Sequence, residues 1–166
     1  FVTDTSPADI AKGAVPMLKK LRDAGIPTIA SNLLPVDEGH RYVITWTGPD
    51  DWGQMRMLAR EFARKMKGTG GYCIVRHVAG TSCFLSRTWS VVSELKKIAP
   101  TMTCLDMQTT DLDAEKTKRQ VSAWLDEFGD RLKGIVSADD SKAQIGIVEA
   151  LKEAGRNDVV CVSAGS

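Results

Sequence analysis

The sequence lacks several features that would point to a particular class of protein. Its 166 residues contain no run of about eighteen apolar residues, so no segment is suited to span a membrane. Lysine and arginine total 22 against 21 aspartates and glutamates, and a net charge of +1 gives no bulk attraction to nucleic acid or an anionic membrane surface. Low-complexity segments and short-period repeats are also missing. With 43% hydrophobic residues, the chain can form one ordinary domain, or parts of two, and a small ligand with little charge is favoured.

Cysteine is scarce and is not arranged for metal binding. Cys73, Cys83, Cys104 and Cys161 lie far apart and form neither a C-x-x-C motif nor a histidine spacing suited to zinc. Three of them lie in apolar runs typical of strands, so we expect buried thiols that act as small hydrophobic side chains. Cys73 and Cys104 could lie on neighbouring strands, and a disulfide in an oxidising compartment stays open as an alternative.

Signals of catalysis are equally sparse. Ser82, His77 and Asp139 could be combined into a triad, but the chain has no G-x-S-x-G motif and only two histidines, His40 and His77. The glycine-rich stretch KGTGGY precedes a predicted strand, whereas a phosphate-binding loop follows a strand and opens a helix. We therefore predict that the protein is not an enzyme and uses no cofactor or metal.

The chain starts with FVTDTSPADI, without an initiating methionine or a signal-peptide pattern. We expect a processed, truncated or partial form of a longer protein, so the missing signal says nothing about secretion.

Short apolar runs alternate with amphipathic stretches along the whole chain. Predicted helices cover about 9–24, 51–66, 82–98, 114–128 and the stretch after residue 140, and predicted strands cover 26–31, 42–46, 72–78, 102–107, 134–138 and 159–163. Pro16 predicts a late start or a kink in the first helix. Continuously apolar strands that alternate with helices predict a parallel α/β sheet with right-handed crossovers. The loop LLPVDEGHR and the later TGPDDW mark the expected passage between two lobes.

In an open parallel sheet, ligands bind at the carboxyl ends of the strands. The residues expected there are hydroxyls, amides, carboxylates, one arginine and aromatic side chains, from segments 31–32, 46–47, 77–87, 108–113, 139–140 and 163–166. Carboxylates accept hydrogen bonds from hydroxyl groups, arginine donates to oxygens, and flat side chains stack on C–H faces. This set of groups suits a polyhydroxylated ligand.

Several of these residues also have a purely structural explanation. Asp139 or Asp140 could cap the helix that follows them. His77 is more simply a core or hinge histidine at a strand end than a base. Trp89 and Trp124 are expected in the core because they fall on apolar faces of predicted helices.

Three segments carry a resemblance to a known family: AGIPTIASN at 24–32, HVAGTSCFLSR at 77–87 and GIVSADDSKAQIGIVEALKEAGRNDVVCVSAGS at 134–166. Together they resemble the type I periplasmic sugar-binding proteins of ABC importers, in the ribose-binding branch. The resemblance implies two Rossmann-like parallel-sheet lobes joined by a hinge, of which the chain covers about half. Residues 1–49 would be part of the first lobe with a hinge strand, and 50–166 the second lobe, incomplete at its C-terminal end.

The resemblance also implies ligand contacts in the second lobe. Arg87 matches the family's ligand arginine, and Cys83 lies at a small-residue contact position one helical turn before it. Asp139 matches the asparagine or aspartate that bonds ligand hydroxyls, while Asp140 matches the neighbour that supports the loop or caps the helix.

Other positions depart from the family's pattern. Asn32 stands where ribose-type members have an aspartate, and Leu33 where they have an arginine. Leu112 replaces an aromatic residue that stacks on the sugar, and Gly165 stands where an aspartate is usual. The implied ligand is therefore another pentose, a hexose, a polyol or a less sugar-like compound.

The function that the resemblance implies is capture without chemistry. A monomeric periplasmic protein would close its lobes on one sugar or polyol and deliver it to an ABC permease in the membrane. It would not bind nucleic acid. The alternative is the effector-binding domain of a LacI-type transcription regulator, a cytoplasmic dimer with the same fold. Four unpaired cysteines favour the cytoplasm slightly, whereas the pattern of ADDSKAQIGIVEALKEAG favours the importer.

Overall fold

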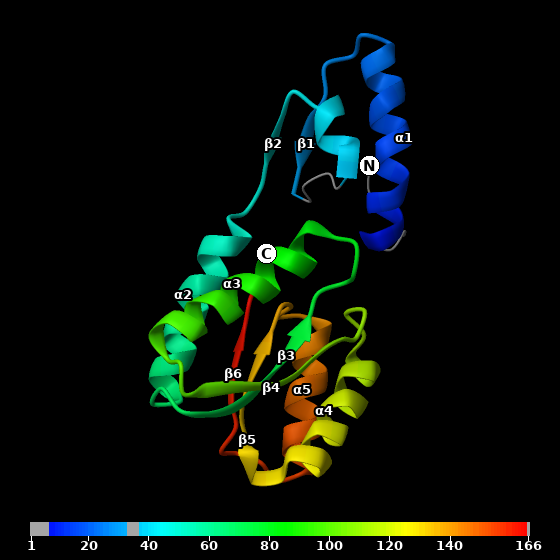
Figure 1. Ribbon diagram of the computed structural model, residues 1–166. Helices are drawn as coiled ribbons and strands as arrows, with labels where there is room; N and C mark the ends of the chain where they lie inside the picture. Colours follow the sequence, from blue (N-terminus) through cyan, green and yellow to red (C-terminus); the bar gives the residue numbers. More distant parts are fainter. Residues whose placement is uncertain (1–6, 33–36, 166) are drawn as a thin grey trace.

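Helices and strands alternate along the chain in two parts that are joined after β2 (Figure 1). The computed structural model describes residues 7–32 and 37–165. The helices are α1 (Pro7–Asp23), α2 (Asp51–Lys65), α3 (Ser82–Ile98), α4 (Ala114–Phe128) and α5 (Lys142–Glu153). The strands are β1 (Ile29–Ser31), β2 (Thr45–Thr47), β3 (Gly70–Arg76), β4 (Met102–Thr109), β5 (Leu132–Ser137) and β6 (Val160–Ser163).

The first part consists of α1 and a small sheet in which β1 pairs with β2 in parallel. The strand predicted at 42–46 is partly wrong, because a 3-10 helix covers Asp37–Tyr42 and β2 begins only at Thr45. Of the two alternatives for the first helix, a late start is wrong, since α1 begins at Pro7 and contains Pro16.

The second part is a four-stranded sheet in the order β4-β3-β5-β6, with every strand parallel to its neighbour. The predicted parallel α/β architecture is therefore confirmed. Among the helices of residues 7–32 and 37–165, none is both long and apolar enough to cross a bilayer.

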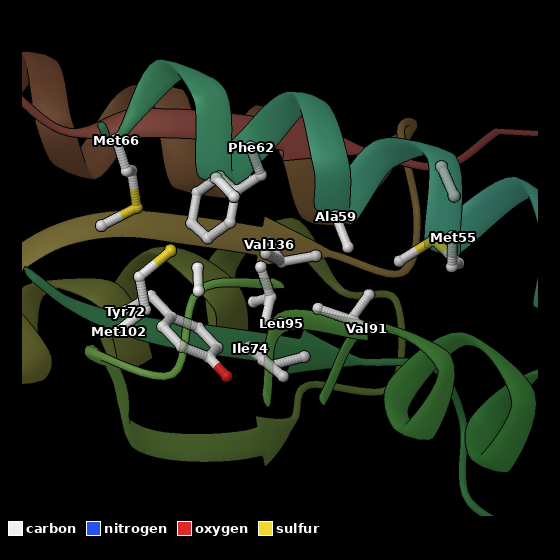
Figure 2. Packing of buried hydrophobic residues seen from close by; sticks show 13 residues of the cluster. Met55, Ala59, Phe62, Met66, Tyr72, Ile74, Val91, Leu95, Met102 and Val136 are labelled. Carbon is white, nitrogen blue, oxygen red and sulfur yellow. The ribbon is translucent and has the colours of Figure 1, made fainter. Parts of the chain in front are cut away.

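Helices cover both faces of this sheet, and each face has its own core. Tyr72 and Ile74 of β3 pack with side chains of α2 and α3, as Figure 2 shows, while Cys73 and Val75 pack with those of α4 and α5. Successive residues of a strand point to opposite faces, so a strand covered on both sides must be apolar throughout. This explains the continuous apolar run that marks β3 in the sequence.

The two tryptophans expected in the core differ in their burial. Trp124 is buried, and its Nε1 donates a hydrogen bond to Asp106 Oδ2 at 2.7 Å. The expectation for Trp89 is wrong, because its side chain is 45% exposed. Val91, two residues later, is fully buried, and two residues on a helix lie roughly 200° apart around its axis.

All four cysteines are free thiols. Cys73 stands opposite Asp106 and Cys104 opposite Tyr72 in the β3–β4 pairing, so the two cysteines do not face each other and form no disulfide. Burial raises the pKa of Cys73 to about 12 and that of Cys104 to about 11, which makes both thiols poor nucleophiles.

Candidate functional site

The order of the strands creates a natural binding position at the edge of the large sheet that is formed by the carboxyl ends of its strands. From β3 the chain passes through α3 to β4 on one side, and then returns through α4 to β5 on the other side. The carboxyl ends of β3 and β5 therefore flank the point where the strand order reverses, and ligands of open α/β sheets bind at such points. His77 follows β3 and Asp139 follows β5 closely.

Arg87 is the centre of the contacts at this edge. Its Nε donates to Asp51 Oδ1 at 2.7 Å, and its Nη1 donates to the carbonyl oxygen of Ala138 at 2.8 Å. The side chains of Arg87 and Asp51 are only 7% and 11% exposed. One guanidinium thus connects the start of α2, the first turns of α3 and the turn after β5.

The two aspartates at the start of α2 make different contacts. Asp50 is the N-cap of α2, and its Oδ1 accepts a hydrogen bond from the backbone of Gly53 at 2.8 Å. The second oxygen of Asp51, Oδ2, accepts the thiol of Cys83 at 3.3 Å. Burial first, and then the Asp51 carboxylate, raise the pKa of Cys83, so this thiol is a neutral donor and not a nucleophile.

Asp139 shapes the start of α5. Its carboxylate accepts hydrogen bonds from Ser141 Oγ at 2.8 Å and from the backbone of Ala143 at 3.0 Å, and its carbonyl accepts Ser137 Oγ at 2.6 Å. Asp140 is exposed. The structure therefore gives Asp139 the capping contacts that the resemblance assigned to Asp140.

Gly165 lies two residues after β6 and is held by α2. Its carbonyl accepts Gln54 Nε2 at 3.2 Å. A Cβ on Gly165 would overlap the carboxylate of Asp140, so glycine is required while that carboxylate stays in place.

His77 has a structural partner at the end of β3. Its Nδ1 lies 3.1 Å from Thr81 Oγ1, and Thr81 is the N-cap of α3. Burial and then the Arg87 charge lower the pKa of His77, while Asp139 and Asp51 oppose them more weakly. The imidazole is therefore neutral at pH 7, as the structural explanation of His77 requires.

A hollow of about 350 Å³ opens beside Asp51 and beside α3, the helix that contains Arg87. Its lining combines two indole rings, two carboxylates and two hydroxyls, from Trp46, Gly48, Pro49, Asp50, Asp51, Trp52, Ser82 and Ser86. Hollows of about 370 Å³ and 320 Å³ lie elsewhere, lined respectively by residues between Arg22 and Ile44 and between Thr109 and Ala123. We place the candidate site at the first of the three because only it includes a partner of Arg87.

Two of the expected ligand residues lie apart from this cluster. Asn32 follows β1 at φ 70°, where its backbone nitrogen donates to Thr47 at 2.9 Å and its carbonyl accepts Trp46 Nε1 at 3.1 Å. Leu112 is half-buried at φ 57° in the turn between β4 and α4. Leu33 lies outside the described residues. The structure thus brings Cys83, Arg87, Asp139 and Gly165 to one sheet edge, while Asn32 stands in the first part of the chain.

Asp51 and Gln54 are the site residues that sequence reasoning missed. A signal for Asp51 was present, because only one aspartate of the doublet at 50 and 51 can cap the helix. Gln54 gives no such signal, since an amide inside a helix usually faces solvent. Among the described residues, no three histidine, cysteine, aspartate or glutamate side chains gather as a metal site would require.

Comparisons with known proteins identify relatives of this chain. Residues 5–166 match the family model described as periplasmic binding protein domain. The xylitol-binding protein of Mycolicibacterium smegmatis is 26% identical over 150 residues, which is 89% of this chain and 41% of that protein.

Solved structures share the fold. An ABC transporter solute-binding protein from Agrobacterium vitis with bound D-fucose has a TM-score of 0.81 at 20% identity, over 90% of this chain and 51% of that one. One from Bacillus halodurans C-125 with bound myo-inositol also has a TM-score of 0.81 at 20% identity, over 91% and 51%. The chain therefore spans about half the length of these relatives, or less. The match over residues 5–166 and the shared type I fold of two-lobed binding proteins show that this chain belongs to the periplasmic binding protein domain family.

Proposed function

We propose that the protein containing this chain is a solute-binding protein that captures a sugar or polyol for ABC-type import. The observation that carries the proposal is the buried Arg87–Asp51 pair at the switch point of the sheet, next to a hollow lined by indoles, carboxylates and hydroxyls. The named relatives support the ligand class, since one binds xylitol and others hold D-fucose and myo-inositol.

In this proposal residues 1–49 belong to a first lobe with a hinge strand, and 50–166 to a second lobe. Support comes from the separate sheets, because β1 and β2 pair only with each other in the described residues. The ligand would bind to both lobes and stabilise the closed form by the contacts that exist only there. Asn32 would contribute from the first lobe, and Arg87 with Asp51 from the second.

The groups at the site fit hydroxyl-rich ligands. Asp51 Oδ2 accepts only a thiol, which is a weak donor, so a ligand hydroxyl can replace Cys83 at little cost. Arg87 uses Nε and Nη1 in the bonds above, and no partner among the described residues is recorded for Nη2. Trp46 and Trp52 offer flat faces on which the C–H side of a sugar ring can stack.

The proposal includes a monomeric, periplasmic protein that needs no cofactor and delivers its ligand to a membrane permease. The regulator alternative is not favoured, because the named structural neighbours are ABC transporter solute-binding proteins. Its test is whether the full-length gene product carries an N-terminal helix-turn-helix.

A thermal-shift experiment on the full-length protein tests ligand capture directly. Xylitol, D-fucose, myo-inositol and D-tagatose are the first compounds to use, each at several concentrations. A compound at one hundred times its Kd adds about 2.7 kcal/mol to the free energy of unfolding, which corresponds to roughly 3–10 °C in Tm for a protein of this size or larger.

Asp51→Asn is the test variant, and Asp130→Asn is its control. Asparagine keeps the shape of Asp51 but removes the charge, so the ligand-induced shift should fall in this variant relative to its own ligand-free Tm. Asp130 lies in the 3-10 turn that precedes β5, at the amino end of the strand, and its substitution should leave the shift unchanged. A well-folded full-length protein that shows no shift with any of the four compounds would remove the support for sugar or polyol capture.

A further inference from the structure

The two helical layers that cover the large sheet differ in charge. The helices α2 and α3 lie side by side on one face of the sheet, and α4 and α5 cover the other (Figure 1). Together α2 and α3 contain seven lysines and arginines against three aspartates and glutamates, whereas α4 and α5 contain five of each kind. The N-caps Asp50 and Asp113 add one negative charge to each layer and keep this difference. Positive charge is therefore concentrated on the layer formed by α2 and α3.

Part of this charge lies where α2 and α3 contact each other. The carboxylate of Glu94, only 3% exposed, accepts Arg56 Nε at 2.8 Å and Arg60 Nε at 2.6 Å. The two arginine side chains remain 39% and 58% exposed. Because two guanidinium groups share one carboxylate, the three side chains together carry one positive charge, and its two carriers reach the surface.

The same layer exposes large apolar side chains. Trp52 of α2 is 44% exposed, and Leu85 and Trp89 of α3 are 56% and 45% exposed. Leu85 and Trp89 are four residues apart, so they lie on the same side of α3. Val91 of α3 points into the core instead, as Figure 2 shows. The exposed side of α3 is therefore apolar near its start, although the core contacts of this helix are satisfied by its other side.

Trp52 connects this surface to the candidate site. It lines the hollow of about 350 Å³ together with Ser82 and Ser86, which lie in the first turns of α3. Leu85 directly precedes Ser86, and Trp89 follows Ser86 by three residues, close to one helical turn. Trp52, Leu85 and Trp89, with Arg56 and Arg60 beside them, are called the α2–α3 patch below.

The composition of the α2–α3 patch fits a protein partner. Tryptophan and arginine are the side chains that contribute most often to binding energy at protein–protein interfaces, and clustered exposed apolar residues mark such surfaces. Apolar side chains of a partner would cover the two indoles, and carboxylates would pair with Arg56 and Arg60. An anionic membrane also attracts positive charge, but each indole is already more than half covered by the protein, so neither ring projects as a membrane anchor.

We infer that the α2–α3 patch docks a segment of a partner protein that presents apolar side chains flanked by carboxylates. The inference rests on the proposed function, in which this partner is the membrane permease. Trp52 borders both the patch and the hollow, so the permease would contact the second lobe directly beside the captured solute.

Uptake by intact cells, compared with binding by the purified full-length protein, tests this docking surface. Xylitol, D-fucose and myo-inositol, each radiolabelled, are the probes, and the cells produce either wild type or one variant. Trp89→Ser should leave the Kd of the probe that wild type binds within about twofold and the Tm within about 2 °C, as expected for an exposed position. The initial rate of uptake at low probe concentration should fall about tenfold, as for the loss of an interface hot spot.

Two matched controls lie on the opposite layer. Ile145→Ser removes an exposed apolar side chain from α5 and should leave uptake unchanged. Arg60→Gln should lower uptake about threefold, the effect of one ion pair at the rim of an interface, while Arg56 still pairs with Glu94. Arg119→Gln removes an exposed charge from α4 and should have no effect on uptake.

The outcomes distinguish the inference from the proposed function. If wild type binds a probe and Trp89→Ser takes it up as well as Ile145→Ser does, the docking surface is overturned while capture stands. A raised Kd in Trp89→Ser would place the residue in the ligand site, and a large loss of Tm would mean that the protein's own chain covers it; either result overturns the inference.

Vesicles made of equal parts of phosphatidylglycerol and phosphatidylcholine test the membrane as the competing occupant. If wild type sediments with these vesicles and Trp89→Ser does not, the patch binds lipid and the inference is overturned. If wild type binds none of the probes, the proposed function fails and the inference fails with it.

Discussion

Replacement of Arg87 by glutamine should destabilise the fold strongly, because Arg87 forms a buried ion pair. Its side chain is 7% exposed, and that of Asp51 is 11% exposed. Removal of one partner of a buried pair typically costs 3–5 kcal/mol, since it leaves the other charge without compensation. The residual exposure of Asp51 places the expected loss at the lower end, about 3 kcal/mol, or roughly 6–12 °C in Tm.

Glutamine is the informative substitution because it keeps much of the length of Arg87 and can still donate to the carbonyl of Ala138. Urea unfolding followed by far-ultraviolet circular dichroism gives the free energy of unfolding by linear extrapolation. Asp51→Asn and the double variant complete a cycle that isolates the pair. We expect a coupling energy of about 1–3 kcal/mol, so the double variant should lose less than the sum of the two single variants.

A small and additive effect would refute this reasoning. If Arg87→Gln costs less than about 1 kcal/mol and its effect adds to that of Asp51→Asn, the pair behaves as an exposed surface ion pair. Arg87 would then not organise the edge of the sheet, and its guanidinium would be free to turn toward a ligand.

Other predictions concern the sheet edge and the helix packing. The pKa of His77 is lowered in the folded state, so below pH 6.5 the unfolded chain takes up a proton that the folded chain does not, and stability falls with acidification. His77→Gln should reduce the loss of unfolding free energy, measured by urea unfolding, between pH 7.5 and 5.5. The reduction is at most about 1.4 kcal/mol per pH unit, and an unchanged loss would contradict the assignment. Gly146→Ala should lower the free energy of unfolding, measured with urea, by about 1–3 kcal/mol, because a Cβ there overlaps the carbonyl of Ala114 in α4. Ile145→Ala is the control, since the side chain of Ile145 is exposed. Equal effects of the two substitutions would refute the close approach of α5 to α4.

The sequence predicted the second part of the chain well because local chemistry and tertiary structure agree there. The predicted helices at 82–98 and 114–128 match α3 and α4, whose N-caps Thr81 and Asp113 accept backbone hydrogen bonds as their residue types favour. The parallel sheet followed from strands that are apolar on both faces. The location of the candidate site followed in turn, because the strand ends of a parallel sheet share one edge.

The sequence predicted the first part and the partners within the site less well. Asp37–Tyr42 forms a 3-10 helix, a short element whose residues carry little periodicity. The Arg87–Asp51 pair joins residues 36 positions apart, and periodicity gives no register for such a contact. The resemblance assigned the cap to Asp140, but Asp139 forms the capping contacts, because an aspartate at either position can cap the helix.

Two aspartate doublets have the same division of roles at the candidate site. In each doublet one carboxylate satisfies backbone or hydroxyl donors at a helix start, Asp50 for α2 and Asp139 for α5. The other member is left for the sheet edge, and the surroundings of these two members differ. Asp51 pairs with the buried Arg87, whereas Asp140 is exposed and has no ion pair among the described residues, so only the doublet of α2 links its helix to another element through an ion pair.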